Sequence, residues 1–352
     1  MGFSCGSLSH DSTAGQSGGS AAFVRIEDSA TMPRVINRKA AKKPGEEGGG
    51  EFDVLKWPVA KHPPKRTRLR IGIHTSTSGG VALAAERAYR LGCNALQIFS
   101  SSPRQWRGAS IRPEQSEEMH RLRATYDLAP LVVHTNYLVN VCSATPLFLA
   151  KSIAAFRGEV ERALALKAEY LVLHPGSFRG MTRDEGLRTA AESIAKSVNG
   201  LDLATGGLQI LIENTAGAEF SLGGSFEQVG ELVERLRAVA PVGACIDTCH
   251  THVAGYDITS VDGYEATLRQ LDATVGLKQV RVWHCNDAKK PCGSKLDRHE
   301  HIGKGTIGKK PFQWLLNDPR LAHAAFIAET PIDEPGDDLR NVEALKKLVS
   351  SS

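Results

Sequence analysis

The sequence is organised around residues 242–250, which read Val-Gly-Ala-Cys-Ile-Asp-Thr-Cys-His. The first five residues form an apolar run of strand length, which ends on the carboxylate Asp247 and is followed three residues later by the imidazole His250. A charge at the edge of a core is stable only when it is paired or bound to a metal. Cys245 and Cys249 are four apart, which is not the Cys-x-x-Cys spacing of a zinc or redox pair. The pattern therefore assigns the chemistry to Asp247 and His250 and predicts structural cysteines.

Seven other apolar runs of similar length occur along the chain, and helix-length amphipathic segments separate them. These runs cover residues 69–73, 95–99, 130–133, 170–173, 208–212, 280–283 and 325–328. Strands that alternate with helices form a parallel sheet, and eight strands close a (β/α)₈ TIM barrel. An open doubly wound sheet is the structural alternative, but it would usually carry a Gly-x-Gly-x-x-Gly turn after its first strand, and this chain has none there. We therefore predict an α/β fold, a (β/α)₈ TIM barrel.

Polar side chains stand where the predicted strands end. In chain order they are His74, Ser100, His134, His174, Glu213, Asp247, His284 and Glu329. Functional residues of TIM barrels collect at these C-terminal strand ends. A hydrogen-bonded residue at the core edge would explain any one of them, but seven imidazoles and carboxylates around one rim favour a metal site. Borderline cations such as Zn²⁺ take such ligands.

A long connection follows the seventh predicted strand, at residues 286–299. It exceeds the usual length of a βα connection in a barrel, which makes it a functional candidate. Asp297 and His299 are two residues apart, so in an extended segment their side chains lie on the same side and can grip one ion. His250 could supply a third ligand from the neighbouring strand end.

Residues 1–68 differ from the rest of the chain. They alternate Gly/Ser clusters with basic runs and show no apolar periodicity, which predicts a disordered extension ahead of a barrel domain at residues 69–352. The basic runs at residues 39–43 and 61–68 could be nuclear-import patches, although a solvated basic linker would look the same. A mitochondrial presequence is also compatible but weaker. The expected location is therefore the nucleus, with the mitochondrion as a further possibility.

Charge and composition narrow the class of protein. The chain carries 43 Lys and Arg against 39 Asp and Glu, and residues 1–68 hold 11 and 7 of these, so the remainder carries 32 of each. A neutral domain does not by its charge alone indicate a nucleic-acid partner. The sequence holds no run of 18 apolar residues, so we expect no membrane helix. Seven scattered cysteines favour a reducing compartment over a disulfide framework.

Three blocks of the chain resemble the signature sequences of the endonuclease IV family, the zinc-dependent apurinic/apyrimidinic endonucleases. The blocks are residues 134–140, residues 243–250, and residues 284–289 leading to Asp297-Arg298-His299. Residues 104–106, 174–177 and 213–217 also resemble family segments. The resemblance spans about residues 69–348 and leaves out the N-terminal extension. Its one small departure is Val139, where the family more often has Ile or Met.

The resemblance implies three Zn²⁺ ions per chain. Their ligand sets would be His134, His174 and Glu213; Glu213, Asp247, His284 and Glu329; and His250, Asp297 and His299. Glu213 would bridge the first two ions and act in catalysis by orienting the nucleophile. His74 is left over, either near a ligand or phosphate or simply satisfying a local hydrogen bond.

The resemblance also implies the reaction. The substrate would be damaged double-stranded DNA, cut 5′ to an abasic site to leave a 3′-hydroxyl and a 5′-deoxyribose phosphate, in base excision repair. Removal of 3′-blocking groups, a 3′-phosphodiesterase and 3′-phosphatase activity, would use the same chemistry. Arg104, Tyr137 and Leu138 resemble the family residues that push into the base stack, as wedging side chains do when proteins kink DNA.

Two other functions fit parts of this pattern. Related sugar isomerases and epimerases are also barrels with a His/Glu/Asp metal centre, but they would leave Asp297, His299 and His250 without a purpose. A non-catalytic binder of DNA damage would have lost one or more of the nine ligands, and all nine are present here. We expect a monomer that has no membrane partner.

Overall fold

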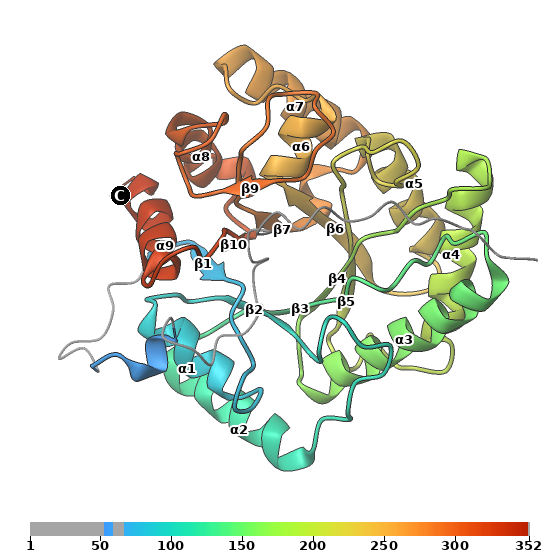
Figure 1. The fold of residues 1–352 in the computed structure, drawn as a ribbon, viewed down its shortest axis with the longest axis horizontal. Helices are drawn as coiled ribbons and strands as arrows, with labels where there is room; N and C mark the ends of the chain where they lie inside the picture. Colours follow the sequence, from blue (N-terminus) through green and yellow to red (C-terminus); the bar gives the residue numbers. More distant parts are fainter. Residues whose placement is uncertain (1–52, 59–66, 351–352) are drawn as a thin grey trace, which may run out of the picture. The chain divides into compact units, whose positions relative to one another are not determined.

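The computed structural model describes residues 53–58 and 67–350. Its centre is a sheet of eight parallel strands, which the helices surround (Figure 1). The strands are β1 (Arg70–Ile73), β2 (Leu96–Phe99), β3 (Leu131–His134), β4 (Tyr170–Leu173), β5 (Gln209–Glu213), β6 (Val242–Asp247), β7 (Val280–His284) and β10 (Ala325–Ala328). They coincide with the eight predicted runs. The TIM-barrel prediction is confirmed.

The barrel closes between its first two strands. The sheet order is β1-β10-β7-β6-β5-β4-β3-β2, which places β1 and β2 at its two ends. A parallel bridge joins His74 to Gln97, and the backbone N–H of Thr75 donates to the Gln97 carbonyl at 2.8 Å. Closure leaves no free sheet edge within the barrel, so the C-terminal ends of all eight strands meet at one mouth.

Each strand packs on both of its faces, which explains the uninterrupted apolar runs in the sequence. Side chains of alternate residues fill the barrel interior: Ala95, Val132, Val172, Leu211, Cys245, Val282, Ala325 and Ile327. The other face of each strand packs against the helices in a larger core. Because both faces are apolar, the sequence shows no polar alternation along these strands.

Helices connect the strands around the outside of the barrel (Figure 1). They are α1 (Leu83–Arg90), α2 (Pro113–Tyr126), α3 (Pro146–Ala165), α4 (Arg183–Val198), α5 (Phe226–Leu236), α7 (Val261–Thr274), α8 (Lys309–Asn317) and α9 (Asp337–Leu348). A shorter helix, α6 (Thr248–Ala254), starts directly at the end of β6. Asp247 is its N-cap, with a carboxylate oxygen that accepts the His250 backbone N–H at 2.8 Å. This cap fixes the turn that carries the two residues singled out first in the sequence.

The connection after β7 contains two short antiparallel strands, β8 (Asp287–Ala288) and β9 (His299–Glu300). Buried Asp287 accepts the backbone N–H groups of Gly305 at 3.0 Å and Ile307 at 2.9 Å, which ties the far end of the connection back to its start. The N–H of Lys295 donates to the Val253 carbonyl of α6 at 2.8 Å. The long connection is therefore anchored at both ends and against α6.

A short part of the predicted extension packs on the barrel. Residues 53–58 include the 3-10 turn η1 (Val54–Lys56), and buried Asp53 forms an ion pair with Arg87 of α1 at 2.7 Å. The prediction of disorder up to residue 68 is therefore wrong for this piece, because a buried cation on α1 needs its carboxylate. The rest of the predicted extension lies almost entirely outside the described residues.

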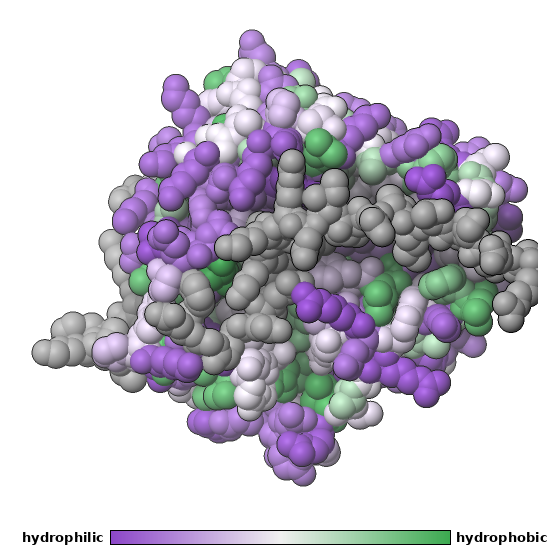
Figure 2. Space-filling model, viewed as in Figure 1, coloured by the Kyte–Doolittle hydropathy of each residue, from purple (hydrophilic) through white to green (hydrophobic). Residues whose placement is uncertain are grey.

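The described helices and one face of the surface can be compared with what a membrane-spanning element requires. None of the helices in the described ranges is both long and apolar enough to cross a bilayer. On the face drawn in Figure 2, hydrophilic residues predominate and hydrophobic ones lie scattered among them.

Candidate metal centre

The predicted rim residues do meet at the mouth of the barrel. His134, Glu213, Asp247 and His284 are the last residues of β3, β5, β6 and β7, and Asp247 lies opposite His284 in the β6–β7 pairing. His174 and Glu329 directly follow β4 and β10. Parallel pairing puts all these ends on one side of the sheet, so sequence position alone brings the side chains together.

Among the described residues, three groups of possible ligand atoms from His, Asp and Glu alone form within the mouth, each with its atoms within 4.8 Å of one another. The groups are His134, His174 and Glu213; Glu213, Asp247, His284 and Glu329; and His250, Asp297 and His299. The structure thus brings together all nine residues that the sequence singled out. A His/carboxylate set of this kind is typical of Zn²⁺ and related cations.

Glu213 lies at the centre of the first two groups and is fully buried. One of its carboxylate oxygens lies 3.0 Å from His134 Nε2 and 3.1 Å from His174 Nε2, and the other lies 2.8 Å from His284 Nδ1. Burial would raise the pKa of this carboxyl, but His174, His284 and His134 together hold its pKa well below the usual value. An ionised carboxylate with one oxygen toward each group is placed to bridge two cations.

Three of the candidate ligand histidines have one ring nitrogen held by a backbone carbonyl. Nδ1 of His134 lies 2.8 Å from the Thr135 oxygen, Nδ1 of His250 lies 2.9 Å from the Asn214 oxygen, and Nδ1 of His299 lies 3.0 Å from the Glu329 oxygen. A carbonyl can only accept, so each Nδ1 carries a proton and each Nε2 is the nitrogen turned toward the mouth, where it could bind a metal in place of a proton. Histidines that ligate metals are oriented in this way.

The third group, His250, Asp297 and His299, is also arranged so that it could bind a cation. Asp297 lies 3.4 Å from His250 Nε2 and 3.2 Å from His299 Nε2. Buried His299 Nε2 has no hydrogen-bond partner within the described part of the chain. Burial lowers the pKa of His299, but Asp247 and Asp297 outweigh it and raise the pKa to about 9. The surroundings therefore favour positive charge here, and the residues present fit a metal ion.

The two cysteines of residues 242–250 lie close to the same mouth. Cys245 falls within reach of Glu213 and His284, and Cys249 within reach of Asp247 and His299. Burial raises the pKa of both thiols well above the usual value, which disfavours the thiolate that metals prefer. Both side chains pack in the core, in agreement with a structural role.

Polar residues that the sequence reasoning missed support the ligands. The Asn286 side chain donates to Asp247 Oδ2 at 2.6 Å, and the Asn214 side chain accepts the Asp247 backbone N–H at 2.7 Å. Gln97, buried in β2, contacts two candidate ligands, His284 and Glu329. A polar residue inside the apolar run 95–99 was the available signal for Gln97. By contrast, rim residue Ser100 lies outside these groups and hydrogen-bonds Glu159 and Arg162 of α3.

The residues predicted to enter DNA lie on two connections beside the mouth. Arg104, in the connection after β2, is exposed, and so is Tyr137, in the connection after β3. Leu138 is half-buried, and its backbone N–H donates to the Asn136 side chain at 2.9 Å. The Tyr137 ring packs edge-on against Phe99 at a centroid distance of 5.2 Å. The structure places these three residues but does not assign their role.

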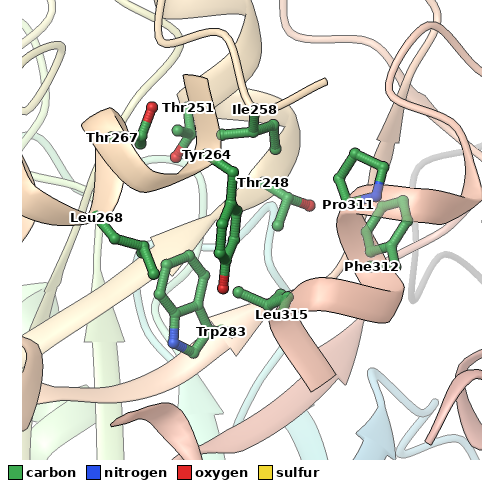
Figure 3. Close-up of a pocket in the computed structure, with 10 residues that line it drawn as sticks. All are labelled: Thr248, Thr251, Ile258, Tyr264, Thr267, Leu268, Trp283, Pro311, Phe312 and Leu315. Carbon is green, nitrogen blue, oxygen red and sulfur yellow. The ribbon is translucent and has the colours of Figure 1, made fainter. Parts of the chain in front are cut away.

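A small apolar cavity lies between α6, α7, α8 and β7 (Figure 3). Tyr264, Trp283 and Phe312 contribute to its wall, and its volume is about 20 Å³. The Thr248 hydroxyl, also in the wall, donates to the Asn286 carbonyl at 2.7 Å. A space of this size holds about one water molecule, so it is a packing defect and not a substrate pocket.

Comparison with known proteins identifies the class and then the family. The family model described as "Xylose isomerase-like TIM barrel" matches residues 85–348. The fold and the mouth thus define a TIM-barrel protein of the xylose isomerase-like class. Within that class, the chain is 48% identical over 285 residues to a probable endonuclease 4 of Solibacter usitatus, covering 80% of this chain and 98% of the relative. The chain belongs to the endonuclease IV family, as its sequence blocks predicted.

Solved structures agree with this assignment. Endonuclease IV from Thermus thermophilus matches with a TM-score of 0.69 and 37% identity, covering 79% of this chain and 98% of the other. A D-tagatose 3-epimerase-like protein matches with a TM-score of 0.59 at 19% identity, covering 80% of this chain and 97% of the other. At that identity the second likeness concerns the fold alone.

The same relatives correct the predicted location. The proteins named probable endonuclease 4 come from bacteria, among them Solibacter usitatus, Chloroflexus aurantiacus and Geobacter sulfurreducens. Bacteria have neither a nucleus nor mitochondria, so the prediction of nuclear or mitochondrial targeting is wrong. The basic runs on which it rested fall mainly outside the described residues, and their composition fits a solvated linker equally well.

Proposed function

We propose that this chain is a DNA-repair endonuclease that hydrolyses the phosphodiester bond 5′ to abasic sites in duplex DNA. The observation that carries the proposal is the set of three candidate cation groups that share one barrel mouth, two of them joined by buried Glu213. The endonuclease names of its relatives support the same reaction. The products would be a 3′-hydroxyl and a 5′-deoxyribose phosphate, and 3′-blocking groups would be removed by the same site.

The proposed cofactor is Zn²⁺, three ions per chain. The ligands would be His134, His174 and Glu213 for the first ion; Glu213, Asp247, His284 and Glu329 for the second; and His250, Asp297 and His299 for the third. When bound, such ions acidify water and offset the charge of a phosphate. The chain's own contribution is to hold these side chains in fixed orientations, because Thr135, Asn214 and Glu329 carbonyls anchor the imidazoles.

DNA would bind to the connections that follow β2 and β3, beside the mouth of the barrel. We assign Arg104, Tyr137 and Leu138 to wedge into the base stack at the lesion, which exposes the target phosphodiester to a recessed site. The exposure of Arg104 and Tyr137, on the connections that follow β2 and β3, supports this role. The chain is expected to act on this substrate as a monomer.

A sugar isomerase or epimerase is the alternative that the fold allows. The solved epimerase-like structures share this architecture at low identity. The third group, His250, Asp297 and His299, argues against that function, because it adds a cation site that a one- or two-metal sugar enzyme would not need. Finding three tightly held zinc ions per chain would favour the nuclease, and finding one or two exchangeable Mg²⁺ or Mn²⁺ ions would favour the alternative.

One cleavage assay tests the proposal. The purified full chain, supplied with zinc, is incubated with end-labelled duplex DNA that carries a single tetrahydrofuran abasic analogue. We expect one nick directly 5′ to the analogue, whose 3′-end a DNA polymerase can extend, and we expect EDTA to abolish it. The same duplex with an intact nucleotide is the control. An uncut analogue strand in zinc-replete conditions would refute the proposed reaction.

A further inference from the structure

Gln97 occupies the interior of the barrel mouth. It is the second residue of β2, and its side chain is fully buried among residues from three other strands. These neighbours are His74 after β1, His284 at the end of β7 and Glu329 after β10. Two of the three belong to the candidate four-ligand group.

The contacts of the Gln97 amide define which way it points. Its Nε2 lies 2.5 Å from Glu329 Oε1, and a carboxylate can only accept, so this end must be the NH₂ donor. The same nitrogen lies 3.0 Å from His74 Nδ1. The amide oxygen then faces His284 Nε2 at 2.8 Å. Flipping the amide would set its oxygen against the Glu329 carboxylate.

This orientation settles the state of two candidate ligands. An amide oxygen only accepts, so His284 must donate through Nε2, which leaves Nδ1 to face the metal group. Nδ1 lies 2.8 Å from Glu213 and 3.3 Å from Glu329 Oε2. Gln97 holds the other oxygen of Glu329, Oε1, so that Oε2 is the one turned toward the group.

We propose that Gln97 is a positioning residue for this four-ligand site, fixing the proton of His284 on Nε2 and the rotation of the Glu329 carboxylate. The inference rests on the proposed function, because it needs a cation at this site. It also gives His74 a place outside the ligand set. Gln97 donates to His74 Nδ1, and the His74 ring packs against the Phe99 ring at a centroid distance of 4.4 Å. His74 therefore helps to hold the Gln97 amide in its orientation.

The test compares zinc release from variants of the full chain. Gln97→Met keeps the length of the side chain but removes both amide contacts, and Gln97→Glu keeps an acceptor for His284 but sets a carboxylate against Glu329. The matched control is Gln209→Met in β5, whose amide donates to the Val242 carbonyl at 2.8 Å and contacts no ligand. Each zinc-loaded protein is mixed with excess chromophoric chelator, and the release of each ion is followed.

We expect both Gln97 variants to release one zinc about 10- to 100-fold faster than the wild type, the usual effect of losing a residue that supports a ligand. Gln209→Met should stay within about twofold of the wild type. If wild-type protein holds zinc and Gln97→Met releases it at the wild-type rate, Gln97 has no positioning role while the proposed function stands. If the wild-type protein holds no zinc, the proposed function is refuted, and the positioning role of Gln97, which rests on it, is refuted as well.

A second measurement is independent of folding defects in the variants. In ¹⁵N-labelled, zinc-loaded wild type, the imidazole of His284 should show a metal-bound Nδ1 and an exchange-protected Nε2–H, which Gln97→Met should expose to exchange. Metal bound through Nε2 of His284 in the wild type would overturn the inference, whatever the variants do.

Discussion

Glu213 is the residue on which the proposed centre depends most. Its two oxygens face different candidate sites, so Glu213→Gln would keep its size and remove the charge that two cations share. We expect nicking of abasic DNA to fall on the order of 10³-fold or more, as when an essential catalytic group is removed. Bound zinc should drop below the wild-type level while the circular dichroism spectrum is kept. Exposed Glu219→Gln in the next connection is the control, and near-normal turnover by Glu213→Gln would exclude it from the mechanism.

The sequence predicted the candidate ligands at the barrel mouth, because they stand where strands end. It did not predict the polar residues that hydrogen-bond to those ligands. Ligand candidates such as His134 stand where an apolar run stops, a pattern visible in the sequence. Gln97 and Asn286 show no such pattern, because their partners come from strands that are distant in sequence. Ser100 is the opposite case: it follows an apolar run, as the candidate ligands do, but it contacts α3 and not the candidate metal groups. Only the three-dimensional pairing separates these cases.

A second titratable residue has consequences for stability. Burial, with Asp337 and Asp53 nearby, raises the pKa of Asp338 in α9 to about 7 from an ordinary 3.8. Its Oδ1 is buried and has no hydrogen-bond partner among the described residues. The folded state thus binds this proton more tightly than the unfolded state, so stability is full below about pH 4 and is lost as the pH rises through 7.

Asp338→Asn should therefore stabilise the protein only at high pH. We expect its free energy of unfolding to exceed that of the wild type by about 2 kcal/mol at pH 8 and to match it near pH 4. Urea unfolding at the two pH values measures this difference. Glu343→Gln, exposed on the same helix, is the control and should change little at either pH. A pH-independent effect of Asp338→Asn would contradict the raised pKa.

Among the elements, α3 links the two connections proposed to contact DNA. Buried Glu159 pairs with Arg162 one turn later at 2.9 Å, and it accepts the Asn136 side chain at 3.1 Å. Arg162 Nε donates to the Ser100 hydroxyl at 2.8 Å. Asn136 precedes Tyr137, and Ser100 begins the connection that carries Arg104, so one ion pair on α3 holds both connections.

Glu159→Gln should loosen these connections without disturbing the metal centre. We expect KM for abasic duplex DNA to rise roughly tenfold, because part of the binding energy is lost when the connections are misplaced. Zinc content should stay at the wild-type level. The control is Glu161→Gln on the exposed face of α3, which removes a surface pair with Arg157. A loss of zinc in Glu159→Gln with unchanged KM would assign the pair to the metal centre instead.

Among the secondary-structure elements, the sequence predicted all eight strands of the barrel, because strands that are buried on both faces appear as uninterrupted apolar runs. It did not predict the short elements of the mouth, α6 and the β8–β9 pair. Helix α6 is set by the Asp247 cap, and β8–β9 pairs Ala288 with His299 across a connection that tertiary contacts fold back. Elements this short carry too little periodicity to be recognised in a sequence.

The whole molecule includes more than the segment that resembles the family. Asp53 lies ahead of that segment, yet it forms a buried ion pair with Arg87 of α1, at 2.7 Å and 3.0 Å to its two carboxylate oxygens. Burial raises the pKa of Asp53, but Arg87 outweighs it and lowers the pKa below the ordinary value. Removal of one partner from a buried pair leaves the other charge uncompensated.

Two truncations separate this contact from the rest of the N-terminal region. Deleting residues 1–52 keeps Asp53, so the melting temperature should stay within about 2 °C of the full chain. Deleting residues 1–66 removes Asp53 and leaves Arg87 without its partner carboxylate. The free energy of unfolding should fall by about 3 kcal/mol, the usual loss when one partner of a buried pair is removed. Asp53→Asn in the full chain should reproduce most of that loss, because it removes the charge and keeps the turn. If both truncated proteins have the melting temperature of the full chain, the barrel is stable without residues 53–58, as the predicted domain boundary at residue 69 implies.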